Sequence, residues 1–547
     1  MDAQRELKVA VATVAAAYLA TAAFWVAQAP AGSWWNHIFE FVMWSESDPG
    51  GWYVPAAHEL FDHPGRSCFA GHPGIPLVFL LSAEQWLFYG MARLFGSPLE
   101  FTPFIARHTV LVWAAAKLTM AVLHLASFVS LYAFARAILR RRDLAFLAVG
   151  IYMTSFPVAY YQTRVSVEPV ANIFFFGTLI ALIRVGQTQT GEGARALRWA
   201  AAAGFLAVSA FFTKIHIMAP WPAFAGVWLL VAAVQGPGVT LRRRLVAGLA
   251  YGGGCLAAAV LFAPFTDWQS LRYVWEGSGA AAASLSTFQF FTVMLSRVVG
   301  GVFAAFGQLH ILQVLPAANR STGFFYFEFV FLCAALAGLV LFLRRAGRSE
   351  RRTQLLALVY GLVVSALWFY RSFGTDFHGF HYLFPVVGLL SPLAALAVAA
   401  LVPGLADPAR PRGERALLMA ATILALHASG LLAVFHSKCQ DLLRYPETGA
   451  SFYEAALEKL PAGGRIAVIG KEAHAFHGLS DSYAMPDRRS RLVAELKGLY
   501  LERIRPKGDV APLAADLREH DVAWVIDFTL GDPGPLSIDD WSARASR

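Results

Sequence analysis

Long apolar runs, separated by short polar or basic blocks, make up the chain from residue 9 to residue 435. A helix that crosses the roughly 30 Å hydrocarbon core of a membrane needs about 20 predominantly apolar residues. We therefore predict an α-helical polytopic membrane protein with about 11 transmembrane helices. The helices are expected at 9–29, 108–139, 144–161, 168–186, 198–213, 216–234, 245–265, 323–343, 353–370, 382–402 and 416–435.

Two further apolar stretches, 75–95 and 286–312, contain polar residues that a membrane helix avoids. We expect both to form helices that lie on the outer surface of the membrane instead of crossing it. The interrupting residues are Glu84 and Gln85 in the first stretch, and Arg297, Gln308 and His310 in the second.

Lys and Arg residues are distributed unevenly between the two sides that these helices define. With the N-terminus inside, the inner segments hold 18 of them, whereas the outer segments, which are together longer, hold 9. Cytoplasmic loops carry such an excess of positive charge. The count favours eleven spans and a C-terminus outside the cytoplasm. The first run imitates a signal peptide, but its length and the later spans favour an uncleaved first helix.

The composition changes after the last predicted span. We divide the chain into a transmembrane domain, 1–436, and a small extracytoplasmic α/β domain, 437–547. Ala450–Leu460 has a helical pattern, and Arg465–Ile469 and Val522–Phe528 have the β-branched and apolar composition of strands. The few glycines of this region do not form a nucleotide-binding fingerprint.

Composition excludes some classes of function. Hydrophobic residues are 57% of the chain and charged residues 15%, with a net charge of +9. The basic residues fall in short loops between apolar runs, which indicates membrane topology and excludes nucleic acid as a partner. Cys255 and Cys333 lie inside apolar runs as small hydrophobic residues. Cys68 and Cys439 lie in segments expected outside the cytoplasm, and the sequence leaves their pairing open.

The first outer loop, 31–107, is rich in Asp, Glu and His, in a chain that otherwise avoids charge. Asp48 precedes a Pro-Gly-Gly turn and a predicted helix, Tyr53–Leu60, that lies on the membrane. A carboxylate at an apolar boundary is suited to act as a general base. An Asp that caps a helix explains the position equally well.

Three charged residues are predicted at the same outer boundary: Arg164, Glu168 and Lys214. Glu168 suits a helix N-terminus, and an ion pair with Arg164 is the simple alternative to a catalytic role. Lys214 interrupts an apolar run, where an ionisable group is a functional hypothesis by default. A cation there is suited to hold a phosphate, although a lysine that reaches towards the membrane surface is the alternative.

Histidines near the outer boundary are further candidates. His72 precedes the 75–95 helix, and His378, His381 and Tyr382 precede the span at 382–402. Their spacing matches no zinc motif. Hydrogen bonding to phosphate or hydroxyl groups is the functional interpretation, and an interfacial histidine is the alternative.

The chain resembles the GT-C glycosyltransferases, in particular bacterial relatives of protein O-mannosyltransferases and lipid A aminoarabinose transferases. The resemblance covers about residues 9–435 and follows five segments in order. They are DPGGWYVPAA, HPGIPLVFLL, TSFPVAYYQTRVSVEPVANIFFFGTLIAL, FTKIHIMAPW and HYLFPVVGLLSPLAALAV. Two positions depart from the family pattern: Pro49, where a second acid is common, and His381, where Arg is common.

The resemblance implies a polyprenyl-phosphate sugar donor and transfer to a glycan, lipid or protein acceptor on the outer face of a bacterial plasma membrane. Asp48 matches the presumed catalytic base and Glu168 the second acid. The residues expected to bind substrate or phosphate are Lys214, Arg164, His72, His381, Tyr382 and Tyr53. A divalent cation is left open as a cofactor, because members of the family differ.

We therefore expect an inverting glycosyltransferase, and two alternatives stay open. A transporter or flippase of lipid-linked sugars predicts ionisable residues through the middle of the membrane, where Lys117 and His124 are the main examples. A non-catalytic assembly factor predicts that Asp48, Glu168 and Lys214 do not converge. Convergence of these three residues on the outer side is the structural requirement of the enzyme hypothesis.

Overall fold

The computed structural model describes the residues of several separate ranges of the chain. They are 50–61, 74–101, 104–105, 108–155, 158, 165–188, 193–214, 221–234, 241–266, 268, 334–344, 384–402, 465–469, 503–504, 514–515, 517–518, 522–527 and 536–545. The predicted spans 9–29, 353–370 and 416–435 lie outside this part, and so do the predicted helices at 286–312 and Ala450–Leu460.

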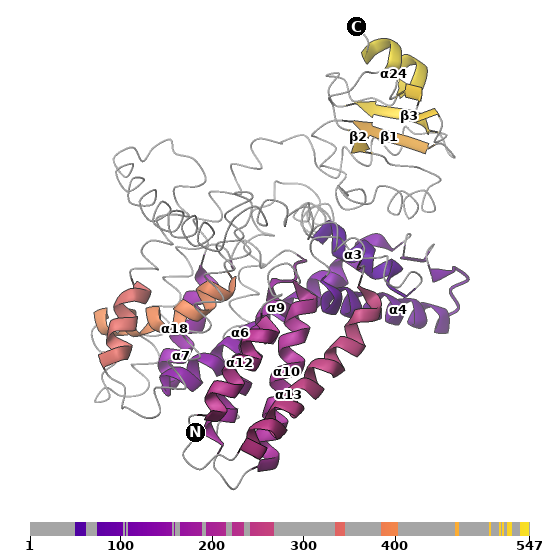
Figure 1. The fold of residues 1–547 in the computed structure, drawn as a ribbon. Coiled ribbons are helices and arrows are strands. Elements are labelled where there is room, and N and C mark those ends of the chain that lie inside the picture. Colours follow the sequence, from indigo (N-terminus) through magenta and orange to yellow (C-terminus); the bar gives the residue numbers. More distant parts are fainter. Residues whose placement is uncertain are drawn as a thin grey trace, which may run out of the picture.

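A bundle of antiparallel apolar helices forms the body of the protein (Figure 1). Helix α9 contacts α6 on one side and α10 on the other, α10 contacts α13, and α18 packs mainly on α7. The bundle helices are α6 (Thr109–Leu139), α7 (Arg142–Thr154), α9 (Glu168–Gln187), α10 (Gly193–Thr213), α12 (Trp221–Val234), α13 (Leu241–Phe262) and α18 (Phe384–Leu401).

This is a helical membrane protein with several apolar spans, as the sequence predicts. Five described helices are long and apolar enough to cross a membrane: Ile75–Leu94, Ala114–Leu139, Glu168–Gln187, Gly193–Thr213 and Leu245–Phe265. The span predicted at 144–161 is shorter in the structure, because α7 ends at Thr154 and Ser155 is extended. Pro157 follows two residues later and opposes helix continuation.

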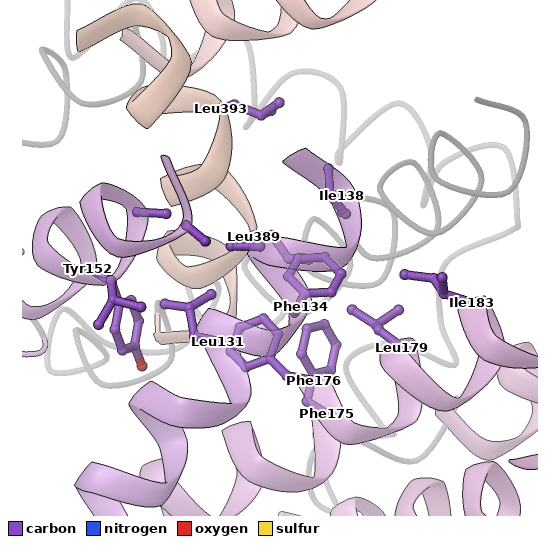
Figure 2. Close-up of a cluster of buried hydrophobic side chains, with 14 of the residues drawn as sticks. Leu131, Phe134, Ile138, Tyr152, Phe175, Phe176, Leu179, Ile183, Leu389 and Leu393 are labelled. Carbon is purple, nitrogen blue, oxygen red and sulfur yellow. The ribbon is translucent and has the colours of Figure 1, made fainter. Parts of the chain in front are cut away.

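Large apolar side chains hold α6, α7, α9 and α18 together. Figure 2 shows Leu131 and Phe134 of α6 beside Phe176 of α9, with Leu389 of α18 close by. The rings of Phe134 and Phe176 lie 5.4 Å apart, centroid to centroid. Gly388 leaves room for the Phe176 ring, because a Cβ at position 388 would collide with it. Shape-matched packing of this kind drives helix association in lipid, where a hydrophobic force between helices is absent.

Small residues bring α10 and α13 into backbone contact. Gly204 lies against the carbonyl oxygen of Tyr251, and Gly254 lies against the carbonyl oxygen of Ala201. A Cβ at either glycine would overlap those backbone atoms. Buried alanines continue the small face of α10 at positions 200, 203, 207 and 210. This contact fixes the position of the end of α10, which precedes Lys214.

Two helices from the first outer loop pack beside the bundle, α3 (Gly50–Glu59) and α4 (Ile75–Leu94). Ile75, the first residue of α4, packs on Phe212 near the end of α10 and on Phe262 at the end of α13. Figure 1 shows α4 running across the ends of these helices. The predicted helix at 75–95 is confirmed, and α4 is also long and apolar enough to span. Its place on the membrane surface stays a prediction. The direction of α4 across the ends of α10 and α13 favours that prediction.

The two ends of the bundle differ in charge. The loops that join α6 to α7 and α9 to α10, and the start of α13, belong to one end of the antiparallel bundle. That end carries the arginines 136, 140, 141, 142, 184, 195, 198 and 242. Glu168 and Lys214 belong to the opposite end, where α9 starts and α10 finishes.

Residues near the C-terminus form a four-stranded sheet in the order β2-β1-β3-β4. Strand β1 (Arg465–Ile469) is parallel to β2 (Arg503–Ile504) and β3 (Val522–Asp527), and β3 is antiparallel to β4 (Leu536–Ser537). The two predicted strands are thus confirmed, the second ending one residue early. Helix α24 (Ile538–Ala545) follows β4, and the Ser537 hydroxyl caps it by accepting a hydrogen bond from the Asp540 N–H, 3.1 Å long.

Candidate functional site

A buried ion pair joins α9 to the end of α10. Glu168 is the first residue of α9, and Lys214 directly follows the last residue of α10. Because the two helices are antiparallel neighbours, these positions lie side by side. The Lys214 Nζ donates to the Glu168 Oε1 across 2.5 Å. The side chains of Lys214 and Glu168 are 1% and 3% exposed.

Local sequence explains where the two helices place these charges. Pro169 at the start of α9 lacks an N–H and has the backbone angle of a first helical turn. Glu168 therefore lies at the positive end of the α9 dipole, and Lys214 lies at the negative end of the α10 dipole. Each charge is at the helix end that favours it. The sequence predicted Lys214 and Glu168 at one boundary, and the structure brings them into contact.

Four more polar side chains from α6, α7 and α9 are buried in the same part of the bundle. The Asn172 amide donates to the Tyr152 hydroxyl, and Ser127 lies at that hydroxyl. The Glu168 carboxylate is close enough to act electrostatically on the Tyr152 phenol. We call the set the polar cluster: His124, Ser127, Tyr152, Glu168, Asn172 and Lys214, each at most 3% exposed.

The polar cluster is costly to bury. A charged pair loses several kcal/mol of hydration per ion in a low-dielectric interior, so an apolar pair of similar volume is often as stable. Ionisable side chains inside a membrane domain therefore mark functional sites more often than stabilising contacts. The burial and contact of Glu168 and Lys214 favour the functional interpretation over a lysine that reaches to the membrane surface.

The first outer loop meets the bundle next to Glu168. Gly74 has a left-handed backbone with φ of 53°. A Cβ on Gly74 would collide with the ring of Tyr53, and it would come within 2.8 Å of the Val167 Cγ1. Tyr53 is 2% exposed in this contact. The residue before Glu168 therefore touches the point where the loop enters α4. Two geometric features of Gly74, a positive φ and an absent side chain, keep that contact tight.

Several predicted site residues lie outside the described part of the chain. Asp48 precedes the first residue of α3 by two positions. The others are His72, Arg164, His378, His381 and Tyr382. Of the predicted residues, the structure describes Glu168, Lys214 and Tyr53, and it places all three at one end of the bundle. The roles assigned to these residues stay predictions.

Sequence reasoning did not select Tyr152, Asn172 or Ser127. A signal was present at Asn172, a polar residue in an apolar run four positions after Glu168. Residues at this spacing share one face of a helix. No comparable signal marked Tyr152, because its partner is on another helix. Within the described residues, no three His, Cys, Asp or Glu side chains gather to hold a metal ion, and the divalent cation stays open.

Comparisons with known proteins find similarity to solved structures alone. No family model matches the chain, and no curated protein matches it. Among solved structures, ArnT from Cupriavidus metallidurans bound to undecaprenyl phosphate is similar at 14% identity with a TM-score of 0.46, over 90% of this chain and 88% of that chain. The apo state of the same protein is similar at 16% identity with a TM-score of 0.45, over 89% and 87%.

Proposed function

We propose that this protein is an inverting GT-C glycosyltransferase. It moves a sugar from a polyprenyl-phosphate donor to an acceptor hydroxyl of a glycan, lipid or protein. The observation that carries the proposal is the buried contact between Glu168 and Lys214 at the bundle end that also receives the first outer loop. The sequence resemblance supplies the reaction class, and the ion pair supplies a cation at this end of the bundle.

The charge asymmetry of the bundle supports an extracytoplasmic site. Arginines gather where α6, α9 and the neighbouring helices turn at the opposite end. By the positive-inside rule, that end faces the cytoplasm. The ion pair then faces outward, in the plasma membrane of a bacterium. In the same topology, the domain at 437–547 is extracytoplasmic and follows a transmembrane domain at 1–436.

The proposed reaction has one bond-forming and one bond-breaking step at the anomeric carbon. Asp48 accepts the proton of the acceptor hydroxyl, and that oxygen attacks the anomeric carbon with inversion. The bond from carbon to phosphate oxygen breaks, and the lipid phosphate leaves with the electron pair. Lys214, with Arg164 and His381, stabilises the negative charge that develops on the phosphate.

Glu168 has a distinct role in this scheme. Its carboxylate forms an ion pair with the ammonium of Lys214 in the described structure. A donor phosphate is a second anion for the same cation, and it exchanges with the carboxylate on binding. Glu168 then turns to the donor or acceptor and orients it. Tyr53, His72 and Tyr382 complete the substrate-binding set.

Transport of lipid-linked sugars is the second candidate. The observation in its favour is the polar cluster, which extends from the ion pair to His124 inside the bundle. A flippase needs polar groups along a path through the membrane. It does not need a general base at Asp48, and this difference separates the two candidates.

The test is sugar transfer by the purified, full-length protein in lipid nanodiscs. A panel of radiolabelled polyprenyl-phosphate sugars is supplied with membrane extracts as acceptors, with and without a chelator. We expect transfer from at least one donor and a loss of roughly 10²–10⁴-fold in rate for Asp48→Asn. Near-wild-type turnover of a folded Asp48→Asn variant overturns the assignment. Movement of donor lipid across proteoliposomes, unchanged in Asp48→Asn, supports transport instead.

A further inference from the structure

Tyr152 holds a defined position at the last turns of α7. Its ring is 1% exposed and meets the Phe128 ring edge to face at 5.9 Å. Its hydroxyl accepts a hydrogen bond from the Asn172 amide. The contact therefore ties α7 to the first turns of α9, where Glu168 begins the helix.

Pro169 presets the backbone angle of the first turn of α9, but no side chain caps that turn. Its N-cap residue is Val167, which offers no side-chain hydrogen bond to the free N–H groups. The rotation of this turn about the helix axis is thus set by contacts with neighbouring helices. Asn172 lies four residues after Glu168, so both project from the same face of α9. A contact that orients Asn172 also orients Glu168.

The hydrogen bond between Asn172 and Tyr152 adds little stability to the contact between α7 and α9. An amide or hydroxyl in an apolar interior costs free energy unless it is hydrogen-bonded, and interhelical hydrogen bonds in membranes add little net stability. Two apolar side chains at positions 152 and 172 would pack the same interface without that cost. Orientation is what the hydrogen bond adds, since it is directional and apolar packing is not.

We propose that Tyr152 and Asn172 are positioning residues that set the orientation of Glu168 by fixing the first turns of α9. The inference rests on the proposed function, because it assigns a catalytic consequence to that orientation. Neither residue touches the donor or acceptor in this scheme. Their effect on transfer is indirect and passes through Glu168.

Three variants separate positioning from stability. Tyr152→Phe and Asn172→Leu each remove one partner of this hydrogen bond and leave the other polar group buried, so each lowers the unfolding temperature Tm. The double variant replaces both partners by apolar groups, a change that can be nearly neutral in stability. We expect its Tm to return towards wild type while kcat stays about tenfold or more below it, with a KM for the donor within about twofold.

A control removes a comparable hydrogen bond away from the polar cluster. The Tyr251 hydroxyl donates to the Pro222 carbonyl oxygen at 2.6 Å, between α13 and α12. Tyr251→Phe should lower Tm and leave kcat unchanged. The inference is overturned if kcat recovers together with Tm in the Tyr152→Phe/Asn172→Leu variant, or if Tyr251→Phe lowers kcat as much as Tyr152→Phe does.

A second measurement does not depend on activity. If wild-type protein transfers no sugar from any donor, the proposed function fails, but the structural part of the inference is still tested by thermal unfolding. A double-mutant cycle of Tyr152→Phe with Glu168→Gln reports their coupling. We expect the combined Tm shift to differ from the sum of the single shifts. Additive shifts overturn the positioning role of Tyr152, and the cycle also serves if the Asn172→Leu variants do not fold.

Discussion

Removing one partner of the Glu168–Lys214 ion pair should destabilise the protein far more than removing both. The two charged groups touch at 2.5 Å and are 3% and 1% exposed. Lys214→Met leaves the carboxylate in the bundle without its cation, at a cost of roughly 3–5 kcal/mol. For a chain of 547 residues the corresponding fall in Tm is roughly 3–5 °C, measured by intrinsic fluorescence in detergent.

The double variant Glu168→Gln/Lys214→Met removes both charges and should recover most of the lost Tm, because the desolvation penalty of both ions disappears. It should not recover sugar transfer. A charge-reversed variant, Glu168→Lys/Lys214→Glu, keeps an ion pair but opposes both helix dipoles, so its Tm should be lower than wild type. If Lys214→Met alone leaves Tm unchanged, the pair is not a desolvated contact and the structural basis of the site is refuted.

Four other variants test the fold of the bundle. Gly254→Leu places a side chain on the α10 backbone and should destabilise by about 1–3 kcal/mol or more. Gly253→Leu, whose Cβ meets nothing within 4 Å, is the matched control and should keep the wild-type Tm. Gly74→Ala strains a left-handed residue and pushes on Tyr53, so both Tm and transfer should fall. For Asp143, burial raises the pKa of the carboxyl, but the hydrogen bond and charge of Arg141 and backbone N–H groups outweigh it, so the pKa is below its ordinary value. The ionised Asp143 carboxylate stabilises the fold above the unfolded-state pKa, and this stabilisation is lost as the pH falls through the folded-state pKa. In Asp143→Asn, Tm should therefore fall less steeply at acidic pH than in the wild type.

Helix positions followed from the sequence where one rule decided them. The start of α9 at Glu168 was predictable, since an acid and then a proline precede an apolar run of spanning length. The end of α7 was not predicted, because the apolar run of the sequence continues past Thr154 while the backbone becomes extended at Ser155. Hydropathy gives the length of an apolar run, but backbone geometry sets the residue at which the helix ends.

The candidate site was predictable only in its charges. A Lys and a Glu at apolar boundaries stand out by composition, so the sequence alone indicates Lys214 and Glu168 as candidates. Tyr152 does not stand out, because tyrosine is ordinary both at membrane interfaces and in cores. Its bond to Asn172 depends on how α7 and α9 are rotated about their axes, and no local pattern encodes that rotation.

The burial of Lys214 has a consequence for how a donor would bind. An ammonium that is fully covered and already paired with Glu168 cannot meet a lipid phosphate while the pair stays closed. If the proposed transfer is right, donor binding includes the exchange of one anion for another on Lys214, and part of the binding free energy is used to separate the pair. Every polyprenyl-phosphate sugar presents the same phosphodiester anion, whichever sugar it carries. Recognition of the sugar must therefore come from other groups, and the first outer loop, which meets the bundle at Gly74 beside the residue that precedes Glu168, is placed to supply them.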